Sequence, residues 1–267
     1  MDCITTSQVW EIGDCVDLML EIPGGTIDMV LTSPPYDGLR DYGGKSNFVF
    51  EETASELYRV MKDGATMVWV VGDATKNLSE SGTSFRQALH FINIGLKLSD
   101  TMIWDKGCMS YAGGFDVRYA QSFDYMFVLT KGRCKTFHPI KDKKNITAGQ
   151  NMSGPIRQRD GSMKPLSVSS MKHDRPEYGA RFNIWRIPPE TLKRNLGHPA
   201  PMNAHIAYDH IRSWSNPGDC VLDPFLGGGT TLAECKKLHR NGIGFEINPE
   251  YEELIRNRLN RAIPELR

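Results

Sequence analysis

A glycine-rich loop follows an apolar run late in the 267-residue chain. Residues 221–231, VLDPFLGGGTT, predict a strand, a tight turn and the start of a helix. Glycines let a ligand approach the backbone closely at the carboxyl end of such a strand. Glu246 lies 17 residues past Gly229, at the end of the next expected strand, where a carboxylate can accept hydrogen bonds from ribose hydroxyls. These residues predict a site for a nucleoside cofactor.

The composition of the loop narrows the choice of cofactor. Gly227 and Gly229 match two glycines of the dinucleotide pattern GxGxxG, but position 232 is leucine, and no GxxxxGK[ST] sequence occurs. Asp223 would repel a phosphate, whereas it would suit a cationic amino-acid group. S-adenosylmethionine carries an ammonium and a sulfonium, so this cofactor fits better than one with a pyrophosphate. The alternative is a tight strand-to-helix turn that binds no ligand.

A second distinctive segment, residues 32–36 (TSPPY), follows the apolar run 27–31. Two consecutive prolines fix φ and remove two N–H donors. The Ser33 hydroxyl and the Pro34 carbonyl can then form a rigid pair of acceptors for an exocyclic amine, and Tyr36 can stack on a flipped base. Alone, such a tetrapeptide would most often be a turn. Together with the glycine loop, it indicates chemistry on an amine.

The elements that must position these residues follow from hydrophobic periodicity. Apolar runs alternate with helical patterns, which is typical of an α/β fold with a mostly parallel sheet. The expected strands are 27–31, 65–71, 101–104, 125–130, 219–223 and 242–247. The expected helices are 51–61, 85–94, 204–214, 230–238 and a closing helix that shows one apolar face over 251–259.

The charge is concentrated in one part of the chain. The whole chain is neutral, with 32 basic and 32 acidic residues. Residues 131–194 nevertheless hold 15 basic and 5 acidic residues, a net charge of +10, whereas 1–130 carry −9 and 195–267 carry −1. This segment is also rich in Gly, Ser and Pro. It could be only a solvated loop, but its concentrated charge favours binding of a polyanion.

Composition excludes several other classes of protein. No apolar run of about 18 residues is present, so no transmembrane helix or membrane partner is expected. The N-terminus shows no secretory signal. The six cysteines are scattered without a CxxC pair, which argues against zinc and disulfides. We therefore expect a cytoplasmic protein with reduced thiols and no metal site.

Together these residues resemble the amino-methylating DNA methyltransferases. Residues 32–36 are similar to their catalytic motif, and 223–231 are similar to their cofactor loop. The catalytic motif comes first and the basic segment lies between the two, as in the β group of the family. Segments 12–14, 56–73, 104–106, 127–131 and 198–201 are similar to further family motifs. The loop departs from the family's more frequent Gly-Ser-Gly.

This resemblance implies an α/β fold, a circularly permuted Rossmann-like methyltransferase sheet with helices on both faces and a basic target-recognition insertion. Residues 1–130 would be the catalytic half of one methyltransferase domain, and 195–267 would be its cofactor-binding half. Residues 131–194 would form the target-recognition insertion.

The resemblance also implies an activity: methyl transfer from S-adenosylmethionine to N4 of cytosine in double-stranded DNA. The family's serine-type motif usually goes with cytosine, and an Asp or Asn there usually goes with N6 of adenine. The catalytic residues would be Ser33, Pro34, Pro35 and Tyr36. The cofactor would contact Asp14, Thr32, His198, Pro199, Asp223, Pro224, Phe225, Gly227, Gly229, Thr230, Thr231 and Glu246. The DNA would contact Arg157, Arg159, Arg175 and Arg181.

Other functions stay open at this point. The same machinery could methylate N6 of adenine, an RNA base or a protein glutamine, and a catalytically silent DNA-binding module is an alternative from a different class. A cognate restriction endonuclease is a possible partner, and the chain could be a monomer or a homodimer.

Overall fold

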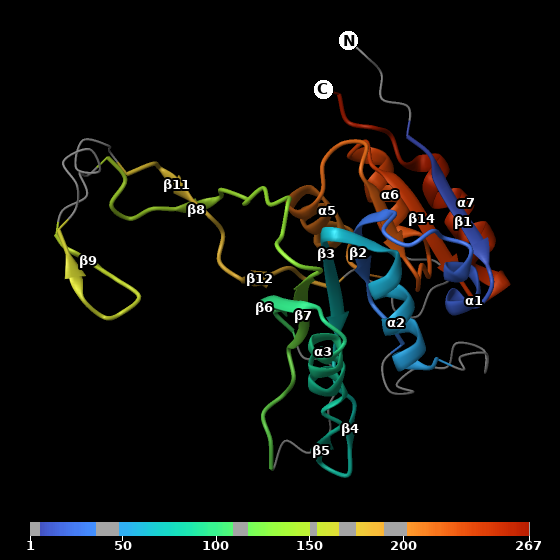
Figure 1. Ribbon diagram of the computed structural model, residues 1–267, viewed down its shortest axis with the longest axis horizontal. Coiled ribbons are helices and arrows are strands. Elements are labelled where there is room, and N and C mark those ends of the chain that lie inside the picture. The colour runs from blue at the N-terminus through green and yellow to red at the C-terminus, as the bar shows by residue number, and fades with distance from the viewer. Residues whose placement is uncertain are drawn as a thin grey trace. The chain divides into compact units, whose positions relative to one another are not determined.

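A computed structural model of the chain describes residues 6–35, 48–108, 117–149, 154–165, 175–189 and 202–266. The chain divides into two compact units. The larger unit combines Met1–His138 with Asn183–Arg267, and the smaller unit is Pro139–Phe182. Most helices and strands of both units are labelled in Figure 1.

The larger unit is built on an eight-stranded sheet. Its order is β1 (Gln8–Ile12), β14 (Asn241–Glu246), β13 (Cys220–Asp223), β2 (Ile27–Thr32), β3 (Met61–Val71), β7 (Phe123–Thr130), β6 (Lys97–Asp105) and β12 (Ile184–Arg186). Only β7 runs antiparallel to its two neighbours, and the other five pairings are parallel. The prediction of a mostly parallel sheet is therefore confirmed.

Helices cover both faces of this sheet. In β7, Phe127 packs in a cluster with residues of α1 (Cys15–Leu20), α2 (Phe50–Val60) and α3 (Thr83–Asn93). The preceding residue, Met126, contacts His210 of α5 (Ala204–Trp214) through its sulfur. Because successive side chains of a strand point to opposite faces, α5 lies on the face opposite α1, α2 and α3. Helix α5 packs on α6 (Thr230–Lys237), and α6 packs on α7 (Glu252–Arg261). The one-turn helix η1 (Pro249–Tyr251) directly precedes α7 in the sequence.

The start of β3 differs from the prediction. We expected the helix 51–61 to end in a turn at 62–64 and the strand to begin at residue 65. Instead α2 ends at Val60, and β3 begins directly at Met61, opposite Ile27 of β2. Lys62 is therefore a strand residue, and its ammonium pairs with Asp28 at 2.6 Å. A partner on the neighbouring strand explains why a polar residue can extend this strand.

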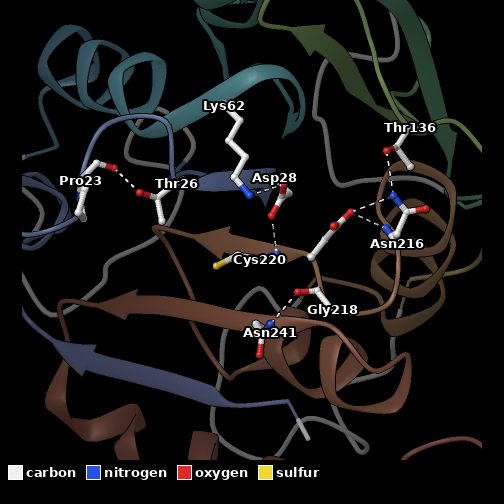
Figure 2. Close-up of polar contacts among 10 residues, drawn as sticks. Pro23, Thr26, Asp28, Lys62, Thr136, Asn216, Gly218, Cys220 and Asn241 are labelled. Carbon is white, nitrogen blue, oxygen red and sulfur yellow. Dashed lines mark hydrogen bonds and ion pairs between the residues drawn. The ribbon is translucent and has the colours of Figure 1, made fainter. Parts of the chain in front are cut away.

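Polar contacts align the strands at their amino ends. Figure 2 shows Asp28 between Lys62 and Cys220: its Oδ2 also accepts a hydrogen bond from the backbone N–H of Cys220 at 3.0 Å. Close by, the Asn241 amide donates to the Gly218 carbonyl at 2.7 Å. These contacts hold β2, β3, β13 and β14 in register, so their carboxyl ends reach one common edge.

In the residues described for it, the smaller unit contains two short antiparallel pairs. Strand β8 (Lys143–Lys144) pairs with β11 (Tyr178–Gly179), and β9 (Ile156–Arg157) pairs with β10 (Met163–Lys164). This unit is shorter than the insertion expected over 131–194, because β12 joins the main sheet beside β6. In the part of the chain that the structure describes, no helix combines the length and apolar character needed to cross a membrane.

Candidate active site

The candidate site lies where four neighbouring parallel strands end. Asp14 follows β1, Glu246 ends β14, Asp223 ends β13 and Thr32 ends β2. Since these strands are adjacent and parallel, their carboxyl ends meet at one edge of the sheet. Ligands of open α/β sheets bind at such an edge. The fold thus brings the expected cofactor loop and the expected catalytic turn together.

Asp223 connects the two motifs. Its side chain is 3% exposed, and its Oδ1 accepts a hydrogen bond from the Thr32 hydroxyl at 2.7 Å. Oδ1 also accepts from the Phe225 N–H at 3.1 Å, and Oδ2 accepts from the Thr231 hydroxyl at 2.5 Å. Burial raises the pKa of Asp223 to about 6, although these hydrogen bonds act in the opposite direction. This carboxylate therefore holds together segments that are 191 residues apart in sequence.

The glycine turn gives the loop its shape. Gly227 and Gly229 have φ of 55° and 80°, the left-handed region that other residues rarely adopt. A Cβ at Gly229 would also lie 3.3 Å from the Cα of Ile255 in α7. Glycine at this position therefore serves both the turn and the close packing of α7. Helix α6 begins immediately afterwards at Thr230.

Glu246 is fixed by two backbone groups. Its Oε2 accepts from the Gly227 N–H at 2.7 Å, and its Oε1 accepts from the Asn248 N–H at 2.8 Å. The residue is 8% exposed, and burial raises its pKa against the effect of these hydrogen bonds. A carboxylate oxygen has two lone pairs, so each oxygen can accept another hydrogen bond. The residue thus fits its predicted role toward ribose hydroxyls, which stays a prediction.

Asp14 follows β1, whose last residue, Ile12, lies opposite Glu246 in the β1–β14 pair. Its Oδ1 caps helix α1 by accepting from the Val16 N–H at 2.8 Å. The Gly13 N–H donates to the carbonyl oxygen of Glu246 at 2.9 Å, which fixes the approach of the two segments. The contact of Asp14 with the cofactor adenine also stays a prediction.

The predicted catalytic turn begins in the core at Thr32 and is half-buried by Pro35. Thr32 is fully buried, Pro34 is buried, and Ser33 and Pro35 are half-buried. The remaining loop residues Pro224, Thr230 and Thr231 are buried too, and Phe225 is half-buried. Tyr36, His198 and Pro199 lie outside the described residues.

One acidic residue at this edge ends the segment 56–73 but was not among the predicted site residues. Asp73 follows β3, is buried, and accepts hydrogen bonds from the N–H and the hydroxyl of Ser84 at 2.9 and 2.5 Å. Its position directly after the apolar run 65–71 is the signal that could have indicated it. Asp73 follows the strand next to β2, and its hydrogen bonds with Ser84 anchor the start of α3.

The four predicted DNA-binding arginines differ in their surroundings within the smaller unit. Arg181 pairs with Asp142 at 2.5 Å, and Arg175 donates to the Thr147 hydroxyl at 2.6 Å. Arg157 and Arg159 are exposed on the β9–β10 hairpin, and their guanidinium groups have no partner among the described residues. The structure thus separates two occupied arginines from two that are available to a ligand.

The sheet, the glycine turn and the buried acids at the carboxyl edge define a nucleoside-cofactor-binding protein of the Rossmann-like class. A family model described as a DNA methylase, N6_N4_Mtase, matches residues 27–257. Because this match covers most of the chain, the protein belongs to the N6/N4 amino-methylating DNA methylases. The prediction of S-adenosylmethionine as the cofactor is confirmed by this membership.

Known proteins agree with this family. The orphan methyltransferase M.BamHII of Bacillus amyloliquefaciens is 45% identical over 259 residues, which cover 94% of this chain and 92% of that protein. A solved structure named PvuII DNA methyltransferase (cytosine-N4-specific) aligns with a TM-score of 0.65 and 21% identity, over 97% of this chain and 93% of that one. The structure of an M1.HpyAVI–SAM complex aligns with a TM-score of 0.63 and 22% identity, over 94% and 100%. The predicted methyltransferase fold is confirmed.

Proposed function

We propose that this DNA methyltransferase transfers the methyl group to the exocyclic N4 amine of cytosine in double-stranded DNA. The observation that supports this most strongly is the hydrogen bond between Thr32 and Asp223. It sets the first residue of the catalytic turn against the cofactor loop, so the acceptors Ser33 and Pro34 follow directly beside that loop. Serine at position 33 favours cytosine, because the resembling family usually carries Asp or Asn there for adenine.

The cofactor would lie along the carboxyl ends of β1, β14 and β13. In this placement Asp14 would face the adenine, Glu246 would accept from the ribose hydroxyls, and the methionine part would lie along the glycine turn from Gly227 to Gly229. The residues described at this edge fit such a ligand, because Glu246 keeps acceptor capacity on its two carboxylate oxygens. His198 and Pro199 would complete the methionine end.

The chemistry requires orientation of a poor nucleophile. The lone pair of an exocyclic amine is conjugated with its ring. Hydrogen bonds from both N–H groups to the Ser33 hydroxyl oxygen and the Pro34 carbonyl would localise this pair away from the ring. S-adenosylmethionine supplies the methyl group from its sulfonium. As the amine nitrogen formed its bond to the methyl carbon, the S–C bond of the sulfonium would break and leave a neutral thioether, and the cationic amine would release a proton to solvent. Proximity and orientation carry most of the rate.

The DNA would be held largely by the basic segment 131–194, which we propose as the target-recognition region between the catalytic half 1–130 and the cofactor-binding half 195–267. Arg157 and Arg159 are the foremost candidates for contacts to phosphates or guanine edges, because their side chains are exposed and without described partners. Arg175 and Arg181 would shape this region through Thr147 and Asp142. A duplex base is inaccessible to the turn, so the target base would be flipped out. A cognate restriction endonuclease stays a predicted partner.

Product analysis tests the proposal. Purified protein is incubated with S-adenosylmethionine and unmodified DNA of mixed sequence, and the DNA is digested to nucleosides for mass spectrometry. We expect N4-methylcytosine. N6-methyladenine would keep the family, the cofactor and the site, but it would overturn the assignment of the base.

A variant at Ser33 tests the proposed role of the turn. Ser33→Ala should lower kcat about 100-fold, the size seen when one preorganised hydrogen-bonding group is removed from an active site. Binding of S-adenosylmethionine, measured by calorimetric titration, should stay near that of the wild type. Ser33→Thr keeps a hydroxyl at the same position and serves as the control. Unchanged turnover of Ser33→Ala would refute the role of this hydroxyl.

A further inference from the structure

A small hairpin follows β3 and carries an unusual residue at its tip. Strands β4 (Thr75–Lys76) and β5 (Ser79–Glu80) are joined by Asn77 and Leu78, whose φ values are 51° and 64°. Two-residue hairpin loops with two positive φ values favour Asn and Gly. Leucine at the second position is disfavoured by its backbone conformation, and its side chain is 61% exposed. Neither local conformation nor packing therefore explains Leu78.

The surroundings hold this hairpin in a fixed conformation. At its base, Asp73 accepts two hydrogen bonds from Ser84, which lies in the first turn of α3. These bonds connect the base of the hairpin to the helix. Along its side, the Arg118 guanidinium donates to the Thr75 hydroxyl in β4 and pairs with Glu80 in β5 at 2.7 Å. Strained backbone persists where the surrounding contacts determine it, and such positions gather at functional sites. Leu78 at the tip is therefore exposed to solvent, while contacts at the base and along the side hold the hairpin that carries it.

The hairpin lies at the same edge of the sheet as the catalytic turn. Strand β3 is parallel to β2, and Trp69 of β3 lies opposite Thr32 at the end of β2. The chain continues past β3 into the hairpin, and Figure 1 shows β4 and β5 beyond the end of the β3 arrow. Ser33 likewise begins beyond the end of β2. The hairpin that carries Leu78 therefore extends from the same edge of the sheet at which a nucleic acid would reach Ser33.

We propose that Leu78 is an apolar wedge that enters duplex DNA beside the target base and helps to move this base out of the stack. The proposal rests on the DNA methyltransferase activity described above and names the element that prepares its substrate. The partner is duplex DNA, because its stacked bases offer apolar faces to a leucine that extends from the carboxyl edge of the sheet.

The chemistry of the hairpin suits this partner. Apolar side chains such as leucine insert between base steps in proteins that kink or unstack DNA. A wedge must be carried on a rigid support, and the contacts of Arg118 with Thr75 and Glu80 hold the two strands of the hairpin together. Lys76 is exposed next to the tip and has no partner among the described residues, so its ammonium is available to a phosphate.

Leu78→Gly tests the wedge without endangering the fold. Glycine accepts positive φ, so this variant should melt at or above the temperature of the wild type. The matched control is Asn77→Gly, which relaxes the neighbouring positive-φ position and keeps the leucine. Substrates are two duplex oligonucleotides that contain the methylated site, once it is mapped by sequencing modified DNA. In one the target base is paired, and in the other it is mispaired and already partly unstacked.

We expect Leu78→Gly to methylate the paired duplex about ten-fold more slowly than the wild type, a factor consistent with part of the cost of unstacking a base. On the mispaired duplex it should approach the wild-type rate, whereas Asn77→Gly should match the wild type on both. Equal rates for Leu78→Gly and the wild type on the paired duplex, or equal losses on both duplexes, would overturn the wedge. Absence of methyl transfer by the wild type would instead overturn the activity itself.

Discussion

The hydrogen bond between Thr32 and Asp223 can be removed with little change of shape by Thr32→Val. Thr32 is fully buried, so the variant loses the hydroxyl while keeping nearly the same volume. A hydrogen bond to a charged group contributes about 1.5–3 kcal/mol, and in the variant one donor to a buried carboxylate is missing. We expect the free energy of unfolding to fall by about 2 kcal/mol, and the melting temperature by about 4–8 °C for a domain of this size.

The pH dependence of this loss identifies its cause. The folded-state pKa of Asp223 is about 6, against 3.8 for the free side chain, so folding disfavours the charged form. The contribution of this group to stability is therefore most favourable below pH 4 and declines as pH rises toward 6, by about 3 kcal/mol in total. The Thr32 hydroxyl stabilises the charged form. The destabilisation by Thr32→Val should then reach most of its full value at pH 7.5 and be much smaller at pH 5.

Urea unfolding at the two pH values measures this difference, and Thr32→Ser, which keeps the hydroxyl, is the control. Turnover at pH 7.5 should fall about ten-fold in Thr32→Val, because the catalytic turn loses its fixed position against the cofactor loop. Rescue of turnover by Thr32→Ser would separate this effect from general loosening of the core. An equal loss of stability at both pH values would refute the assigned role of the hydrogen bond.

Two further predictions concern the cofactor and the DNA. Glu246→Gln replaces one acceptor oxygen by an NH2 group that must face a backbone N–H, so S-adenosylmethionine should bind about ten-fold more weakly in calorimetric titration. Arg157→Ala should weaken DNA binding and reduce the slope of log K against log salt by about one, whereas Arg181→Ala, which removes a partner of Asp142, should leave the slope nearly unchanged.

Each of these predictions has an outcome that contradicts it. Cofactor binding by Glu246→Gln at the wild-type affinity would remove Glu246 from the cofactor site. Fluorescence anisotropy at several salt concentrations gives the DNA slopes. A larger change of slope for Arg181→Ala than for Arg157→Ala would mean that the ion pair with Asp142 opens when DNA binds.

The strands that the sequence predicted best are those buried on both faces. Strand β2, with five of its six residues buried, and strand β13, with three of four, carry the apolar runs that burial requires. Strand β1 was not predicted, because it lies at the edge of the sheet and alternates half-buried with exposed residues. Strand β12 was not predicted either: it is three residues long and lies within the basic segment. Short edge strands depend on a neighbour that periodicity does not reveal.

The residues of the candidate site were predicted better than their contacts. The positions of Asp223 and Glu246 at strand ends followed from the apolar runs before them. Their partners did not, because the contact of Asp223 with Thr32 depends on the register of two strands 191 residues apart. Sequence reasoning assigned Asp223 to a cationic ligand, whereas the structure shows both of its oxygens already accepting hydrogen bonds from the protein.

This difference changes what the acid in the cofactor loop does. A carboxylate that is almost fully buried and accepts three hydrogen bonds has little freedom to turn toward a ligand, but its charge still acts over several ångströms in a medium of low dielectric constant. Asp223 can thus favour a cationic cofactor without touching it, while its contacts position Thr32 and Thr231. In a chain where the catalytic turn precedes the cofactor loop by about 190 residues, such a shared carboxylate makes two distant motifs one site. Disturbing it should therefore affect cofactor binding and turnover together, whereas Ser33→Ala should affect turnover alone.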